Sequence, residues 1–205
     1  VADNHIDVVI VDREARGISA DVVLVDNELA GYQATRHLID LGHRIIACIG
    51  VPPELNPIAN RADGYRRAMA EAGITLPPSY QVVGDTQIES GERAIKRLLR
   101  LEPRPTAVFV CNDMMAIGAM RGARLSGVRI PEDLSMVGFD DITLARAMCP
   151  ALTTMAQPIS EMARLATELL IQRMRGELPT AERQRIVLTA RLVVRESTCR
   201  CPAGG

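Results

Sequence analysis

Pairs of polar residues follow several apolar segments of strand length, and these pairs are well suited to bind a small polar molecule. Carboxylates accept hydrogen bonds from hydroxyl groups, and an asparagine amide both accepts and donates them. In open parallel α/β sheets, ligands bind outside the carboxyl ends of the strands. We therefore expect the polar pairs to share one edge of a sheet and to form a binding site there. The pairs are Asp12 and Arg13, Asp26 and Asn27, Gly84 and Asp85, Asn112 and Asp113, and Asp140 and Asp141.

Some of these residues also have an ordinary structural explanation. Asn27 and Asn112 each precede a helical pattern and are good N-caps, and Asp85 suits a turn. Asp140 is harder to explain in this way, because no strong helical pattern follows it for a carboxylate to cap. We expect Asp140 to contact a ligand.

Arg61 is the second residue in an unusual place. It lies in the first turn of a helix expected over 61–72, where the helix dipole disfavours a cation by roughly 0.3–1 kcal/mol. A guanidinium kept there suggests a bound carboxylate or bound sugar hydroxyls. A surface ion pair with Asp63 or Glu54 explains the residue equally well.

The sequence offers little for catalysis or metal binding. The motifs G-x-G-x-x-G, G-x-x-x-x-G-K-[ST], G-x-S-x-G, H-E-x-x-H and paired C-x-x-C do not occur. Asp140 and Asp141 are adjacent, so their side chains diverge and form a poor acid–base pair. His43 follows a helix stop, where we expect it to bond free helix carbonyls instead of acting as a catalyst. Cys199 and Cys201 form one C-x-C without the second pair that a structural zinc site needs. We predict no enzyme activity, no cofactor and no metal site.

The elements that must position these residues follow from the hydrophobic pattern. Apolar, β-branched runs alternate with helical patterns, which is typical of a parallel sheet with right-handed crossovers. We expect strands at 8–11, 22–25, 45–49, 82–83, 107–110 and 134–137, and helices at 28–41, 61–72, 89–100 and 113–126. After residue 141 we expect a short strand at 152–155, a helix over 158–175, a strand near 185–194 and a loose tail from Ser197.

The first two strands lack the helices that should cover them. Either the chain is a fragment of a longer protein that completes this second lobe, or a partner closes the lobe. The 205 residues, of which 47% are hydrophobic and 24% charged, have a globular composition and suffice for one large or two small domains. The net charge of −1 provides no basic field for a nucleic-acid backbone. No run is long enough to span a bilayer and no export leader precedes the first strand, so we expect a cytoplasmic protein.

Several segments of the sequence, called words below, resemble the effector-binding core of LacI/GalR-type transcription regulators. The resemblance runs from about residue 10 to residue 197. Its strongest words are HLIDLGHRIIACIG at 37–50, RADGYRRAMAEAGI at 61–74, PTAVFVCNDMMAIGAM at 105–120 and GVRIPEDLSMVGFDD at 127–141. Shorter words are VDN at 25–27, ESGERAIKRLL at 89–99, PALTTMAQP at 150–158 and VVRES at 193–197. Periplasmic sugar-binding proteins share this fold, but the GFDD, LTT and RES words resemble the regulators more.

The resemblance implies an α/β fold of the periplasmic-binding-protein type I, with two Rossmann-like parallel-sheet lobes. The N-terminal lobe, incomplete in this chain, would hold residues 1–27 and 157–187. The C-terminal lobe would hold 28–156 and 188–200, with 201–205 as a loose tail. A small effector would bind in the cleft between the lobes, by family default a sugar or sugar derivative, and otherwise a nucleobase or another metabolite.

The resemblance also implies site residues. Family positions that touch the effector match Asp12 or Arg13, Arg61, Asn112 and Asp140 in this sequence. Thr86 stands where relatives often place an aromatic residue, and Leu55 and Pro57 lie in a variable pocket segment. Because of these departures, the identity of the effector stays open.

Finally, the resemblance implies partners. Members are repressors that read operator DNA through a helix-turn-helix, and no counterpart of that segment occurs in these residues. We therefore assign DNA binding to the parent protein, and we expect a homodimer that senses a small-molecule effector and has no membrane partner. The alternative from another class is a solute-binding receptor of a sugar transport system. Such a receptor would carry an export signal where a regulator carries its helix-turn-helix.

Overall fold

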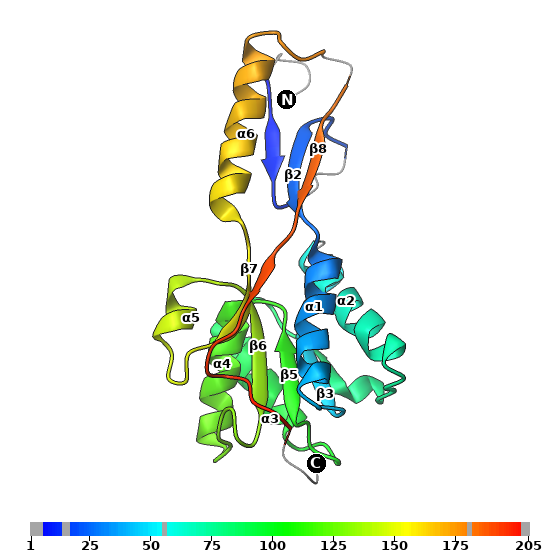
Figure 1. Ribbon diagram of the computed structural model, residues 1–205, viewed down its shortest axis with the longest axis vertical. Helices are drawn as coiled ribbons and strands as arrows, with labels where there is room; N and C mark the ends of the chain where they lie inside the picture. Colours follow the sequence, from blue (N-terminus) through cyan, green and yellow to red (C-terminus); the bar gives the residue numbers. More distant parts are fainter. Residues whose placement is uncertain (1–5, 14–16, 55–56, 180–181, 202–205) are drawn as a thin grey trace. The chain divides into compact units, whose positions relative to one another are not determined.

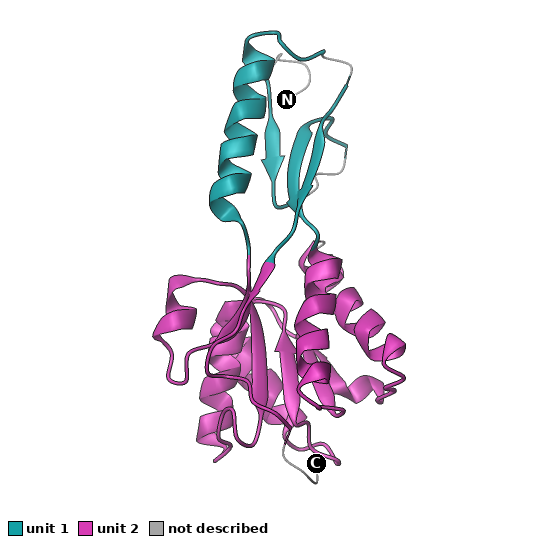
Figure 2. Cartoon of the chain, viewed as in Figure 1, with its two compact units in different colours: residues 1–26, 157–190 teal, residues 27–156, 191–205 magenta. Residues whose placement is uncertain are grey.

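The computed structural model describes residues 6–13, 17–54, 57–179 and 182–201 of the chain. These residues form two compact units, each built from separate stretches of the sequence (Figure 2). Unit 1 holds residues 1–26 and 157–190, and unit 2 holds residues 27–156 and 191–205. Within the described ranges, no helix is both long and apolar enough to cross a bilayer.

Unit 1 contains a small parallel sheet with the strand order β1-β2-β8. Its strands are β1 (Val9–Val11), β2 (Asp21–Val25) and β8 (Arg185–Leu188). Helix α6 (Ile159–Met174) packs against β1 and β2, as Figure 1 shows. A buried ion pair ties the helix to the sheet, because Arg173 Nε and Nη2 donate to the two carboxylate oxygens of Asp21 at 2.7 and 2.8 Å.

Unit 2 contains a six-stranded sheet with the order β4-β3-β5-β6-β7-β9. Its strands are β3 (Ile46–Gly50), β4 (Gln81–Val83), β5 (Ala107–Val110), β6 (Ser135–Asp140), β7 (Thr153–Ala156) and β9 (Arg191–Val193). All neighbouring strands are parallel except β7 and β9, which are antiparallel. β3, β5 and β7 are buried along their whole length, so these strands form the core of the unit.

Two pairs of helices flank this sheet (Figure 1). They are α1 (Asn27–Asp40) with α2 (Ile58–Glu71), and α3 (Ile88–Leu98) with α4 (Asp113–Leu125). Glycines allow the first pair to pack backbone against backbone. A Cβ atom on Gly31 would lie 2.0 Å from the carbonyl oxygen of Arg61, and one on Gly64 would lie 2.0 Å from that of Glu28. This close packing fixes the start of α2, and therefore the backbone of Arg61.

The α/β class and the parallel strands expected from the sequence are confirmed. The four predicted helices within unit 2 and the long C-terminal helix occur with ends shifted by up to three residues. Three local predictions are wrong. The single strand near 185–194 is two strands, β8 and β9, which belong to different sheets. A short helix, α5 (Thr143–Ala147), follows β6 where no helix was expected.

The third wrong prediction concerns the loose tail. Ser197 is fully buried, its hydroxyl donates to the carbonyl of Met136, and it accepts the N–H of Thr153 at 2.8 Å. The N–H of Cys201 donates to the carbonyl of Leu41 at 2.9 Å. Residues 197–201 are thus anchored to unit 2, and residues 202–205 lie outside the described part of the chain.

Candidate functional site

Arg61 is the centre of a buried polar cluster at the carboxyl edge of the unit 2 sheet. Its side chain is 2% exposed. Nε donates to Asn27 Oδ1 at 2.7 Å, and Nη1 donates to the carbonyl oxygen of Cys111 at 2.7 Å and to Asp140 Oδ1 at 3.1 Å. The guanidinium carbon lies 3.5 Å from the centre of the Phe139 ring. The planar donor group is therefore fixed on several sides, as charge-assisted bonds and cation–π stacking both require.

The alternative prediction, that Arg61 forms a surface ion pair with Asp63 or Glu54, is therefore wrong. Asp63 pairs with Arg66 on the exposed side of α2, and Arg61 points into the unit instead. Among the described residues, no acceptor meets its Nη2 atom, so one end of the guanidinium retains donor capacity. A buried cation with this arrangement can bind a polar molecule that reaches the sheet edge.

Asp140 ends β6 and faces Arg61 while 23% of its side chain stays exposed. Its φ angle is 116° and that of Asp141 is 57°, values that non-glycine residues rarely adopt. Asp141 turns to the other side and pairs with Arg195 Nη2 at 2.6 Å. The two carboxylates therefore diverge, as the sequence predicted. Strained backbone of this kind clusters at ligand sites, where the surrounding contacts hold it in place.

Asn112 has the capping role that the sequence suggested, and a second role besides. Its Oδ1 accepts the N–H of Met115 at the start of α4, and its Nδ2 donates to the carbonyl oxygen of Thr86 at 3.0 Å. Thr86 has a φ of 73° and is partly exposed. Asn112 thus ties the end of β5 to the loop after β4, and its amide is already engaged within unit 2.

Asp113 belongs to one of the polar pairs noted in the sequence, but it was not predicted as a site residue. It is fully buried; its Oδ1 accepts from Thr154 Oγ1 at 2.7 Å and its Oδ2 accepts the N–H of Ile142 at 3.0 Å. Burial, which outweighs these two bonds, together with the nearby charges of Asp140 and Asp141, raises the pKa of Asp113 to about 7. Because Asp113 directly follows the predicted N-cap Asn112, the sequence did not indicate that its carboxyl group is buried or that its pKa is raised.

The other predicted site residues are placed as follows. Asp12 and Arg13 follow β1 in unit 1, where Asp12 has a φ of 59° and donates its N–H to Val23. Pro57 lies just before α2, and Leu55 is outside the described residues. Unit 2 therefore brings Arg61, Asn112, Asp140 and Thr86 to one sheet edge, whereas Asp12 and Arg13 belong to the other unit.

The prediction for His43 is confirmed through its backbone, because its N–H donates to the carbonyl oxygen of Leu38 in α1 at 3.2 Å. Its side chain is 1% exposed, and its two ring nitrogens meet Thr106 Oγ1 at 3.0 Å and Ser135 Oγ at 3.1 Å. Burial lowers the pKa of His43. It stabilises the edge of the sheet opposite the Arg61 cluster, since Ser135 begins β6. Among the described residues, no group of His, Cys, Asp and Glu side chains could hold a metal ion.

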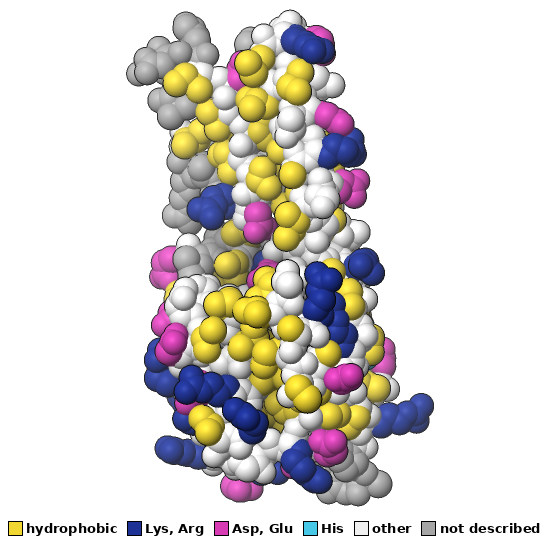
Figure 3. Space-filling model, turned by 90° about the vertical axis from the view of Figure 1, so that its left-hand side faces the viewer, with side chains coloured by type: hydrophobic (Ala, Val, Ile, Leu, Met, Phe, Trp, Pro, Cys, Tyr) yellow, Lys and Arg dark blue, Asp and Glu magenta, His cyan; other side chains and the backbone are white. Residues whose placement is uncertain are grey.

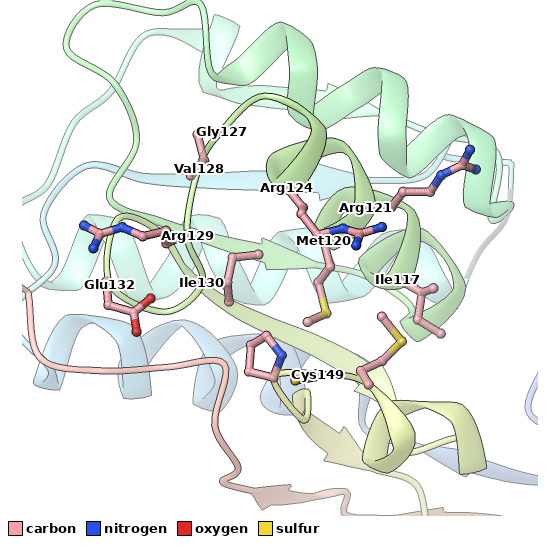
Figure 4. Close-up of a pocket in the computed structure, with 12 residues that line it drawn as sticks. Ile117, Met120, Arg121, Arg124, Gly127, Val128, Arg129, Ile130, Glu132 and Cys149 are labelled. Carbon is pink, nitrogen blue, oxygen red and sulfur yellow. The ribbon is translucent and has the colours of Figure 1, made fainter.

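A groove of unit 2 lies away from this cluster. It has a volume of about 710 Å³ and is formed by one side of α4 and the loops at 127–132 and 148–150. Figure 4 shows Ile117 and Met120 of α4 and Ile130 and Cys149 of the loops along it, with three arginines at its margin. Its lining is mainly apolar, so it lacks the converging polar groups that a site for a hydrophilic molecule needs. We regard the sheet edge, and not this groove, as the candidate effector site.

Comparisons with known proteins assign the chain to a family. A family described as "Periplasmic binding protein-like domain" matches residues 35–198. The ribose operon repressor of Escherichia coli K12 is 43% identical over 164 residues, which are 80% of this chain and 49% of that protein. The HTH-type transcriptional repressor PurR of Klebsiella pneumoniae subsp. pneumoniae is 40% identical over 199 residues, 97% of this chain and 58% of that protein. The chain thus spans about half the length of the curated relatives it matches.

Solved structures agree with these relatives. A regulatory protein of the LacI family from Chloroflexus aggregans has a TM-score of 0.84 and 35% identity, with 93% of this chain and 68% of that chain covered. A LacI family transcriptional regulator from Enterococcus faecium with bound ribose has a TM-score of 0.81 and 31% identity, with 94% and 70% covered. The relatives are transcriptional regulators, not enzymes or transport receptors. This chain belongs to the LacI family of transcriptional regulators and carries their periplasmic binding protein-like domain.

Proposed function

We propose that this chain is the effector-sensing core of a LacI-type bacterial repressor. A small hydrophilic metabolite binds at the Arg61 cluster and controls how the whole protein binds operator DNA. The observation that carries this proposal is the geometry of Arg61 and Asp140: a buried, immobilised guanidinium beside a partly exposed carboxylate on a strained turn. Together they offer both donors and acceptors to hydroxyl groups.

Asn112 and Thr86 complete the proposed contacts in unit 2, and Asp12 and Arg13 are proposed contacts from unit 1. We take unit 1 as the part of the N-terminal lobe that was expected at residues 1–27 and 157–187. The effector acts by binding the DNA-bound and the free conformation of the regulator with different affinity, since a ligand with equal affinity for both shifts nothing. Because operator DNA lies in the bacterial cytoplasm, we propose that the protein works there.

The aromatic side chains favour a sugar over a nucleobase. Phe139 is buried under the guanidinium of Arg61, and Phe109, Tyr65 and Tyr80 are buried as well. The remaining aromatic residue, Tyr32, lies against Arg67. With these aromatic faces covered, a ligand of unit 2 is held mainly by hydrogen bonds, and a sugar offers more hydroxyl groups for them than a nucleobase does. Ribose, the ligand of two neighbouring LacI-family structures, is therefore the first effector to test.

Titration calorimetry with D-ribose, cellobiose and adenine tests this proposal. Asp140→Asn keeps the size of the side chain but removes the charge that binds hydroxyl groups. We expect it to weaken sugar binding about 10- to 100-fold, as for hydrogen bonds to a charged group. The control is Asp40→Asn, at the exposed C-terminal end of α1. Equal affinity of Asp140→Asn and Asp40→Asn would remove Asp140 from the site, and binding of adenine alone would refute the preference for sugars.

We further propose that the protein is a homodimer and that the apolar groove along α4 takes part in its interface. Hydrophobic side chains gather on this face of unit 2 (Figure 3). Leu144 on the adjoining α5 is 52% exposed. A groove lined by Arg121, Arg124 and Arg129 as well as Glu132 offers both signs of charge, as a self-complementary twofold contact requires.

Sedimentation velocity of the Ile117→Glu variant tests this interface. A carboxylate in the groove should shift the chain to monomer at concentrations where the wild type is dimeric. Leu125→Glu is the matched control, because Leu125 is also on α4 and 60% exposed but does not line the groove. A dimer that survives Ile117→Glu unchanged would place the contact elsewhere.

A further inference from the structure

The carboxyl group of Asp113 connects three elements around the proposed site. Asp113 opens α4, Thr154 lies in β7, and Ile142 follows the turn after β6. The chain makes room for this group at Gly138, because a Cβ there would lie 2.3 Å from Asp113 Oδ1. A glycine in the middle of a strand usually marks a close approach of this kind.

The turn that Asp113 holds is the one that presents Asp140. Asp140 and Asp141 both have positive φ angles, which cost of order 1–3 kcal/mol each, so other contacts must stabilise the turn. Three contacts do so: Arg61 with Asp140, Arg195 with Asp141, and the carboxyl of Asp113 with the N–H of Ile142. Of these three, only the last acts on the backbone of the turn.

The charges around Asp113 are unbalanced. Asp140 and Asp141 face it from the turn after β6, and β7 faces it with the uncharged Thr154. The two cations nearby, Arg61 on α2 and Arg195 after β9, are paired with the other two carboxylates and not with Asp113. Ionisation of Asp113 therefore adds a negative charge beside two carboxylates that are already ionic partners of other residues.

Both charge states of Asp113 fit the same contacts. The ionised carboxylate accepts from the hydroxyl of Thr154 and from the N–H of Ile142. The neutral acid can donate its proton to the Thr154 oxygen, which then acts as acceptor, while the other oxygen still accepts from Ile142. The proton thus changes the charge beside Asp140 without breaking the link to the turn.

We propose that Asp113 is a positioning residue of the effector site, which holds the Asp140 turn and makes effector affinity depend on pH through its own charge. This inference rests on the proposed function, because it takes Asp140 as an effector contact. A bound effector excludes water from the exposed part of Asp140 and strengthens its repulsion of ionised Asp113. Binding therefore favours the protonated form of Asp113, and effector affinity falls as the pH rises.

The expected size of the effect follows from this linkage. Burial already raises the pKa of Asp113 to about 7 in the free protein, within the range where binding can be measured. If the effector raises this pKa by a further ~0.5 to 1, affinity falls about 2.5- to fivefold between pH 6 and pH 8.

Calorimetry with D-ribose at pH 6, 7 and 8 tests the proposal on three proteins. Wild type should lose affinity as stated. Asp113→Asn, which copies the neutral acid, should bind at pH 6 as wild type does and keep that affinity at pH 8. Asp40→Asn should keep the wild-type slope, because Asp40 lies on the surface at the end of α1. A pH-independent wild type, or an unchanged slope in Asp113→Asn, overturns the proposal while leaving effector binding at the site intact.

A second measurement needs no effector. The amide ¹⁵N shift of Ile142 should titrate near neutral pH in the free chain, with the midpoint of the Asp113 carboxyl carbon, and this step should vanish in Asp113→Asn. Failure of D-ribose, cellobiose and adenine alike to bind would contradict the proposed function, but a titrating Ile142 would still support the link between Asp113 and the turn. An Ile142 amide that does not titrate overturns the inference whatever the effector is.

Discussion

Removal of the Arg61 side chain should destabilise unit 2 more than the loss of any single surface charge. Arg61→Ala would leave the acceptors of Asn27, Cys111 and Asp140 without their common donor and would uncover the Phe139 ring. Breaking a buried ion pair by removing one partner costs about 3–5 kcal/mol, and hydrogen bonds to a charged group contribute roughly 1.5–3 kcal/mol each without being additive. We expect a loss of about 3–5 kcal/mol in the free energy of unfolding.

Tyrosine fluorescence in a urea titration measures this loss for unit 2, which contains Arg61. The chain has no tryptophan, and its three tyrosines, Tyr32, Tyr65 and Tyr80, all lie in unit 2. Arg66→Ala is the matched control: it removes an exposed pair with Asp63 from the same helix and should cost below about 1 kcal/mol. A loss below about 1 kcal/mol for Arg61→Ala would refute the view that Arg61 organises the sheet edge.

Three further predictions concern the same packing and charges. Gly64→Ala should destabilise unit 2 by at least about 2 kcal/mol in the same titration, because its Cβ would lie 2.0 Å from the backbone oxygen of Glu28. Asp113 should lower the free energy of unfolding of unit 2 by on the order of 3 kcal/mol as the pH rises from about 4 to 7. The pKa of about 7 in the folded state exceeds the ordinary value, so the folded state binds a proton that the unfolded state releases. Asp113→Asn should abolish this slope. Arg173→Met should cost about 3–5 kcal/mol in unit 1, seen as faster amide exchange in β2, because it leaves Asp21 buried without its partner.

Controls separate these effects from general damage. Gly50→Ala places a Cβ no closer than 3.6 Å to its neighbour and should cost less than Gly64→Ala. A Gly64→Ala variant as stable as Gly50→Ala would contradict the backbone-to-backbone packing of α1 and α2. If the unfolding free energies of wild type and Asp113→Asn changed equally between pH 4 and 7, Asp113 would ionise at its ordinary pKa. Amide exchange in β2 that is unaffected by Arg173→Met would show that the ion pair with Asp21 is not needed there.

The sequence was sufficient for those parts of the fold that rest on periodic hydrophobic patterns. Strand β5 was predicted with its observed ends, and the long helix α6 within one residue at each end. The break between β8 and β9 could not be predicted, because residues 185–194 form one continuous β-like pattern and only their tertiary partners separate them. Helix α5 has five residues, too few for a helical period to be recognised.

In the candidate site, too, some residues could be predicted from the sequence and their partners could not. The dipole argument identified Arg61 as unusual, and the missing cap role identified Asp140. Their partners were not foreseeable, because Asn27 lies 34 residues from Arg61 and Asp140 lies 79 residues from it. Likewise, the burial of Asp113 depends on Thr154 in β7, which no local pattern links to the start of α4. Sequence spacing identifies groups able to bind, while tertiary packing decides which of them meet.

The late position of β8 and β9 has a consequence for synthesis of the protein. Both units take a strand from the segment after residue 184, so neither sheet is complete until that segment has left the ribosome. A nascent chain that ends at residue 180 would leave β2 and β7 each with an open edge, to which β8 and β9 later pair. Such edges attract other chains. Premature termination in this region should therefore yield aggregating products, not a smaller working sensor.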